Sequence, residues 1–77
     1  MNHYIFCTGC INYHRTYFGN WVGSKAFQNK RSCIELCKKT PKCEYWKLSS
    51  ERYGYCTLFD EVYSSHYSKD YLAGKKC

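Results

Sequence analysis

The chain has 77 residues, among them 7 Cys, and 12 Lys and Arg against 6 Asp and Glu give it a formal net charge of +6. A chain this short forms one domain and buries little apolar surface, so we expect covalent or metal cross-links to stabilise it. No segment approaches about eighteen apolar residues, which excludes a membrane-spanning helix. No run reaches about five basic residues, so we expect no nucleic-acid partner.

The N-terminal stretch MNHYIFCTGC differs from a secretory signal peptide. It has no basic start, no apolar run and no cleavage site of small residues. If the protein is secreted, we therefore expect the domain to be cut from a longer precursor. We interpret residues 1–9 as an N-terminal extension that carries an extra cysteine, Cys7.

The first half of the chain predicts strands followed by one helix. Residues 12–29 are rich in Tyr, Gly and Asn without a helical period, which predicts short strands and turns. Ser32 and Glu35 have the spacing of a capping box and predict a helix over residues 33–40. Pro41 ends this helix, because proline cannot continue it. The apolar residues of the helix share one face, which carries Cys33, Leu36 and Cys37.

Two β-prone runs, residues 43–48 and 55–59, flank the polar stretch SSERYG and predict a hairpin with a longer loop. Alternation places Trp46 and Leu48 on one face of the first strand, which we expect to face the core. The opposite face carries Tyr45 and Lys47.

The last part of the chain predicts a loop and a strand. Residues 60–70, DEVYSSHYSKD, are too polar for a core strand and predict a surface loop. Residues 71–77 predict a final strand that ends on a cysteine. Besides Trp46, we expect either Phe59 or Tyr55 to be part of the core.

The seven cysteines are compatible with three chemistries. A zinc site could use Cys7, Cys10, Cys33 and Cys37. Structural zinc sites usually take each pair of ligands from a short turn, whereas Cys33 and Cys37 lie one helical turn apart. A CxxC redox motif expects a βαβ unit that this chain is too short to hold. Disulfides are favoured, because each bridge across tens of residues contributes about 3 to 4.5 kcal/mol in the chain-entropy model.

The order of cysteines and aromatic residues in C…YFGNW…SCIELCKKTPKCEYWKL…YCTLF…YLAGKKC resembles a PAN/apple domain. This module occurs in coagulation factor XI, plasma prekallikrein and apicomplexan microneme adhesins, and YFGNW is more similar to the microneme version. The resemblance covers residues 10–77. It implies an α+β fold, with one short helix packed on a curved antiparallel sheet of about five strands, and three disulfides.

The resemblance also implies the pairing of the cysteines. The implied bridges are Cys33 with Cys56, Cys37 with Cys43, and Cys10 with Cys77. Because seven is an odd number, one thiol is left over. It is Cys7, or Cys10 if Cys7 pairs with Cys77. We expect it to be either free or bonded to another chain, which would make a covalent dimer.

The aromatic content points to recognition rather than catalysis. The chain has no G-x-S-x-G, H-E-x-x-H or Gly-rich phosphate motif, so we expect no enzyme activity, no metal and no cofactor. Its nine tyrosines are too many for so small a core, and exposed Tyr beside Lys suits a polar or acidic ligand. The candidate ligand-binding residues are Tyr63, His66, Tyr67, Lys69 and Lys47.

The resemblance implies a non-catalytic adhesion module of a secreted or cell-surface protein that binds a glycan or protein ligand. Similarity to the microneme version implies host-cell attachment, storage in the microneme secretory organelle, and a galactose-type or sialic-acid-type ligand. The alternatives are a protein-binding apple module as in the coagulation zymogens, a stand-alone secreted toxin or anticoagulant, and a small zinc-binding module.

Overall fold

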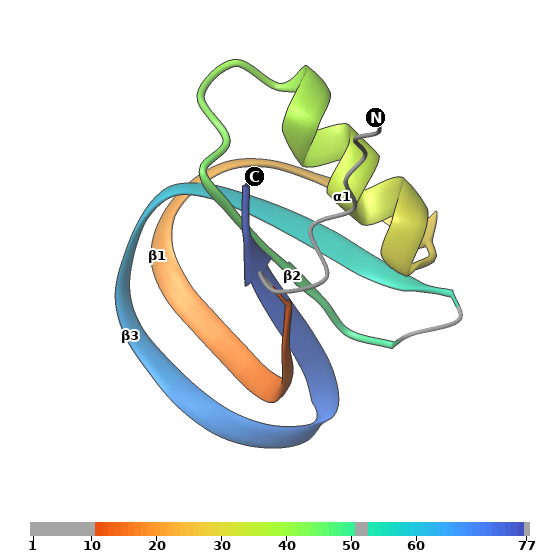
Figure 1. Ribbon diagram of the computed structural model, residues 1–77, viewed down its shortest axis with the longest axis vertical. Helices are drawn as coiled ribbons and strands as arrows, with labels where there is room; N and C mark the ends of the chain where they lie inside the picture. Colours follow the sequence, from red (N-terminus) through yellow and green to blue (C-terminus); the bar gives the residue numbers. More distant parts are fainter. Residues whose placement is uncertain (1–10, 51–52, 77) are drawn as a thin grey trace, which may run out of the picture.

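A computed structural model describes residues 11–50 and 53–76 of the chain. In chain order, this part contains strand β1 (Ile11–Gln28), helix α1 (Lys30–Lys39), strand β2 (Tyr45–Leu48) and strand β3 (Gly54–Lys75). The fold is therefore α+β, with one short helix beside an antiparallel sheet (Figure 1). No helix in these residues is long and apolar enough to cross a membrane.

The sheet has the strand order β1-β3-β2. β1 runs antiparallel to β3 along nearly its whole length, and the two form a long ribbon that bends round on itself (Figure 1). β2 pairs with both ends of that ribbon, because Trp46 lies opposite Leu58 and also opposite Gly74. Residue numbers fall along β3 as they rise along β2 in both pairings, so each pairing is antiparallel. The two ends of β3 therefore flank β2.

The hairpin predicted from the sequence is confirmed, whereas the predicted loop over residues 60–70 is wrong. That segment belongs to β3, which is continuous from Gly54 to Lys75. Its burial still alternates, since Val62 and Ser64 are half-buried and their neighbours are exposed. The strand is held by its ladder to β1 rather than by an apolar face, so polarity alone was a misleading signal.

The short strands and turns predicted over residues 12–29 are also wrong, because β1 is one strand of 18 residues. Its ladder to β3 shifts register at five points. His14 (φ 64°) and Phe27 (φ 57°) are in the left-handed region, and each lies at one of these shifts. Three strands form the described sheet, and the bending of the two long ones gives it its curvature.

Two glycines allow close backbone approaches in this curved sheet. A Cβ atom at Gly19 would overlap the carbonyl oxygen of Glu61 on the facing strand. A Cβ atom at Gly54 would overlap the backbone nitrogen of Ser50, where β3 begins beside the end of β2. A side chain at either position would force the two backbones apart.

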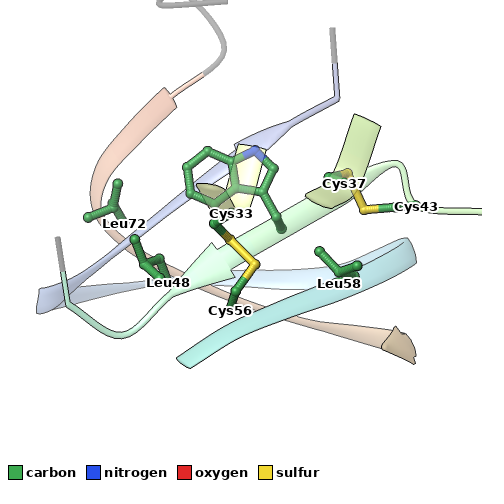
Figure 2. Packing of buried hydrophobic residues seen from close by; sticks show 8 residues of the cluster. Cys33, Cys37, Cys43, Leu48, Cys56, Leu58 and Leu72 are labelled. Atoms are coloured by element: carbon green, nitrogen blue, oxygen red, sulfur yellow. A yellow bond between two sulfur atoms is a disulfide. The ribbon is translucent and has the colours of Figure 1, made fainter. Parts of the chain in front are cut away.

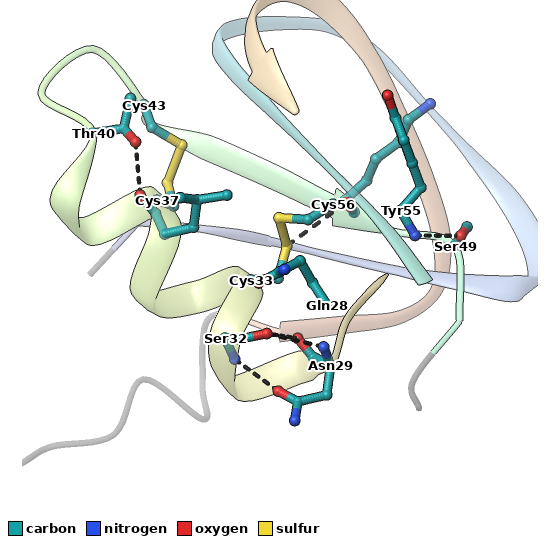
Figure 3. Close-up of a disulfide and its surroundings, with 12 residues drawn as sticks. Gln28, Asn29, Ser32, Cys33, Cys37, Thr40, Cys43, Ser49, Tyr55 and Cys56 are labelled. Carbon is teal, nitrogen blue, oxygen red and sulfur yellow. Dashed lines mark hydrogen bonds between the residues drawn. A yellow bond between two sulfur atoms is a disulfide. The ribbon is translucent and has the colours of Figure 1, made fainter. Parts of the chain in front are cut away.

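Helix α1 begins three residues earlier than the sequence predicted. Its N-cap is Asn29, whose side-chain oxygen accepts from the backbone N–H of Ser32 at 2.8 Å. The backbone N–H of Asn29 donates to the Ser32 hydroxyl at 2.9 Å, which completes a capping box (Figure 3). The predicted box of Ser32 with Glu35 is therefore wrong, since Ser32 is the third residue of the helix and not its cap.

The main core lies between α1 and the sheet. Its buried residues are Cys33, Cys37, Cys43, Trp46, Leu48, Cys56, Leu58 and Leu72 (Figure 2). The predicted inward face of β2 is confirmed, because Trp46 and Leu48 are 1% and 0% exposed while their neighbours are half-buried. The predicted last strand also exists as the end of β3, where Leu72 and Ala73 are buried.

Two disulfides link this core. Cys33 bonds to Cys56, 23 residues away, and Cys37 bonds to Cys43, 6 residues away (Figure 3). These are two of the pairs that the PAN/apple resemblance implies. In the chain-entropy model the longer bridge contributes about 3.5 kcal/mol and the shorter one about 2.4 kcal/mol. The third implied pair and the odd cysteine involve Cys7, Cys10 and Cys77, which lie outside the described residues.

A second, smaller cluster consists of Tyr17, Phe59 and Ala73, with Tyr45 and Val62 packed against it. The rings of Tyr17 and Tyr45 meet edge to face, with centroids 6.0 Å apart. Of the two alternatives for the core, Phe59 is the buried residue, whereas Tyr55 is 53% exposed.

Candidate ligand-binding site

A hollow of about 500 Å³ opens at the bend of the ribbon, between the start of β1, the turn after β2 and the last part of β3. We call it the ribbon hollow. It is lined by Tyr13, His14, Ser49, Ser50, Lys69, Asp70, Tyr71 and Leu72. The hollow is thus lined by two tyrosine rings, two serine hydroxyls, an imidazole, an ammonium and a carboxylate.

Strand pairing brings these residues together. Tyr13 lies opposite Leu72 in the ladder, and the next pair is Arg15 with Tyr67, so His14 alone faces the four β3 residues 68–71. The β3 residues between these pairs, which include Lys69, therefore bow out beside His14. The Nδ1 atom of His14 lies 3.0 Å from the backbone oxygen of Lys69, a contact across 55 residues of sequence.

Tyr13 connects the ribbon hollow to the helix. Its hydroxyl accepts a hydrogen bond of 2.9 Å from Nζ of Lys30, the first residue of α1. The same ammonium lies 5.5 Å from the centroid of the Tyr13 ring. The wall of the hollow is thereby fixed to the disulfide-linked half of the molecule.

Tyr71 connects the ribbon hollow to an aromatic cluster around Lys47. The Lys47 Nζ atom lies 4.5 Å from the ring centroid of Phe18, 5.3 Å from that of Tyr71 and 5.8 Å from that of Phe59. It also donates to the Thr16 hydroxyl at 3.3 Å. Partial burial lowers the pKa of Lys47 below its usual value of 10.5, because desolvation disfavours the charged form.

The structure places the predicted ligand-binding residues in separate groups. Lys69 lines the ribbon hollow, and the ring of Tyr67 lies 6.3 Å from that of His14 at its edge. His66 packs edge to face on Phe18, at 5.5 Å, and so belongs with Lys47 in the aromatic cluster. Tyr63 is 70% exposed.

Sequence reasoning missed most of the lining of the ribbon hollow. Asp70 and Tyr71 directly follow Lys69, so the same polar segment could have indicated them. Tyr13 and His14 gave no signal, because their proximity depends on the register of two strands more than fifty residues apart. Ser49 and Ser50 join the site only because β2 is flanked by the end of β3.

The zinc alternative fails for the helix cysteines. Cys33 and Cys37 would have to be thiolates to bind zinc, but both are consumed in disulfides. Among the residues that the structure describes, no three His, Cys, Asp or Glu side chains converge as metal ligands.

No protein-family model matches the chain, and no curated protein matches it either.

Proposed function

We propose that this protein is an extracellular recognition module of the PAN/apple kind that binds a glycan in the ribbon hollow and catalyses no reaction. Two of the three disulfides implied by the resemblance support the assignment, and disulfides are typical of an oxidising compartment. In this proposal the module serves adhesion, with host-cell attachment as its role if its parent protein is a microneme adhesin.

The chemistry of the ribbon hollow carries the proposal. Sugars present both apolar ring faces and hydroxyl groups, so a sugar site needs aromatic rings beside hydrogen-bonding groups. Tyr13 and Tyr71 supply the rings, and His14, Lys69 and Asp70 supply the polar groups. A volume of about 500 Å³ falls within the usual range for small-ligand pockets and suits one or two sugar units.

A glycan array followed by titration calorimetry tests the proposal. We expect binding to a defined set of glycans, and a loss of affinity of about tenfold for Lys69→Ala, since a charged hydrogen bond would be removed. Tyr67→Ala, at the edge of the hollow, should have a smaller effect.

Lys39→Ala is the matched control, because Lys39 is an exposed lysine on α1, away from the ribbon hollow. It should leave the array profile and the affinity unchanged. If Lys69→Ala and Lys39→Ala have equal effects, or if no glycan binds, the proposed site is wrong.

A second candidate function is binding of a protein partner, as in the coagulation apple domains. The observation that favours it is a group of exposed aromatic residues toward the other end of the ribbon: Trp21, Phe27, Tyr53 and Tyr55. Phe27 is 81% exposed in a left-handed backbone conformation. This candidate predicts cell-surface binding that survives removal of surface glycans by glycosidases and falls for Phe27→Ser but not for Lys69→Ala.

A further inference from the structure

His14, at a register shift between β1 and β3, has a defined hydrogen-bonding role in the ribbon hollow. Its Nδ1 atom lies 3.0 Å from the backbone oxygen of Lys69. A carbonyl oxygen can only accept, so the proton of the neutral imidazole must be on Nδ1. The other ring nitrogen, Nε2, is then a hydrogen-bond acceptor in the neutral ring and becomes a donor when the ring is protonated.

The backbone holds His14 in this position. Its φ of 64° is uncommon for residues with a side chain, although His, Asn and Asp adopt it more readily than most. The register shift at this point belongs to the ladder between β1 and β3, so the ring is positioned by the sheet. The register shift thus places an imidazole at the wall of the hollow.

The charges around His14 are balanced when it is neutral. Lys69 and Asp70 line the same hollow and carry one positive and one negative charge. Tyr13 and Tyr71 line it as well, and Tyr67 lies beside the imidazole. Lys30 donates to the Tyr13 hydroxyl from the helix side, and Arg15, the next residue of β1, bonds to Ser65. Protonation of His14 therefore adds a positive charge to a lining whose charges otherwise cancel.

We propose that His14 sets the charge preference of the ligand site, so that acidification shifts it from neutral sugars to sugars that carry a carboxylate. Neutral His14 accepts a hydrogen bond from a sugar hydroxyl through Nε2. Protonated His14 donates from Nε2 to a carboxylate and attracts its charge. Histidine is the side chain whose charge changes within the physiological range of pH. This inference rests on the proposed glycan site.

The first test needs no ligand. Nitrogen-15 NMR of the intact protein distinguishes the two tautomers of a neutral histidine. We expect His14 to carry its proton on Nδ1 above its titration midpoint. A proton on Nε2 in the neutral state would overturn the inference, because Nε2 could not then accept from a sugar hydroxyl. That result would leave the proposed glycan site standing.

The second test compares galactose with galacturonic acid, which differ only in the carboxylate at C6, by NMR titration between pH 8 and pH 5. We expect the affinity ratio of the acid to the neutral sugar to rise about tenfold as the pH falls, which is the usual effect of one charge-assisted hydrogen bond. Galacturonic acid stays ionised over this range, so a change in the affinity ratio reflects protonation of the protein and not of the sugar.

His14→Asn is the informative variant. Asn tolerates the left-handed conformation and its amide can still donate to the Lys69 backbone oxygen, but it does not titrate. The variant should bind both sugars with a ratio that is flat with pH, whereas His66→Asn should keep the wild-type pH dependence. An unchanged pH dependence in His14→Asn would overturn the inference. Failure of both sugars to bind at any pH would count against the glycan site itself.

Discussion

The two faces of β2 differ in how they are stabilised. The face toward α1 holds buried Trp46 and Leu48, and two disulfides join the elements around it. The opposite face holds Lys47, whose ammonium is enclosed by three aromatic rings and bonded to Thr16. Beyond it the ribbon continues as a two-stranded segment with Tyr63 and Tyr67 exposed.

This difference indicates that the stabilising contacts are concentrated on one side of β2. A small domain cannot be stabilised everywhere, so cross-links and apolar burial are concentrated on the helix side. The bend of the ribbon is held mainly by backbone pairing, and exposed side chains such as Tyr67 lie along it. Loss of a contact on the helix side should therefore lower the free energy of unfolding. Loss of one at the ribbon hollow should change binding alone.

Trp46→Ala should cause the largest loss of stability. Trp46 is 1% exposed at the centre of the main core, and truncation of a buried Trp typically costs about 3 to 5 kcal/mol. Urea denaturation followed by circular dichroism measures the free energy of unfolding. The paired control is Tyr63→Ala on the exposed ribbon, which should change this free energy by less than about 0.5 kcal/mol. Equal losses for the two variants would contradict the division described above.

The two disulfides should contribute different amounts to the free energy of unfolding. Replacing Cys33 and Cys56 together by Ser should lower the free energy of unfolding by about 3.5 kcal/mol, because this bridge closes the longer loop. The double replacement at Cys37 and Cys43 should cost about 2.4 kcal/mol. Differential scanning calorimetry of both double variants shows which replacement lowers the stability more. A reversed order would mean that loop entropy is not the main contribution.

Removing the helix cap should cause a smaller loss of stability. The position of this loss distinguishes the observed N-terminus of α1 from the one that the sequence predicted. Asn29→Ala removes the acceptor for the Ser32 backbone N–H and should cost about 1 kcal/mol. Glu35→Ala should cost less than about 0.5 kcal/mol, because Glu35 is exposed on the helix and not part of the cap. Chemical denaturation compares the two. A larger loss for Glu35→Ala would restore the capping box that the sequence predicted.

Lys47 should give the smallest effect, visible as a pH dependence. Its pKa is lower in the folded protein than in the unfolded chain because of desolvation. Above the folded pKa the unfolded chain binds more protons, so stability should rise with pH up to the usual value of 10.5. Lys47→Met keeps an unbranched apolar stem without the ammonium, so the difference in stability between wild type and variant isolates this effect. A difference that is constant or falls as pH rises would contradict the lowered pKa.

The sequence predicted the helix and hairpin well because their signals are local. Pro41 follows the helix, and alternation identified the buried face with Trp46 and Leu48. The cap was displaced by three residues because Asn29 and Ser32 form a capping box that competes with the predicted one. The polar segment over residues 60–70 was misassigned because its strand conformation comes from pairing with β1.

Only part of the candidate site could be predicted in this way. The mixed polar and aromatic segment that contains Tyr67 and Lys69 allowed these residues to be predicted as candidates. The ribbon hollow itself depends on the register between β1 and β3 and on its shift at His14, and neither leaves a pattern in the sequence. A positive φ at a histidine is a property of the folded sheet.

The most direct test of the central claim is a two-dimensional NMR titration of the folded protein with the glycan that binds best on the array. We expect chemical-shift changes at the backbone amides of Tyr13, His14 and the segment 69–72, with α1 unaffected beyond Lys30, which contacts Tyr13. Shift changes centred on α1, or no saturable change with any array-positive glycan, would contradict a glycan site at the bend of the ribbon.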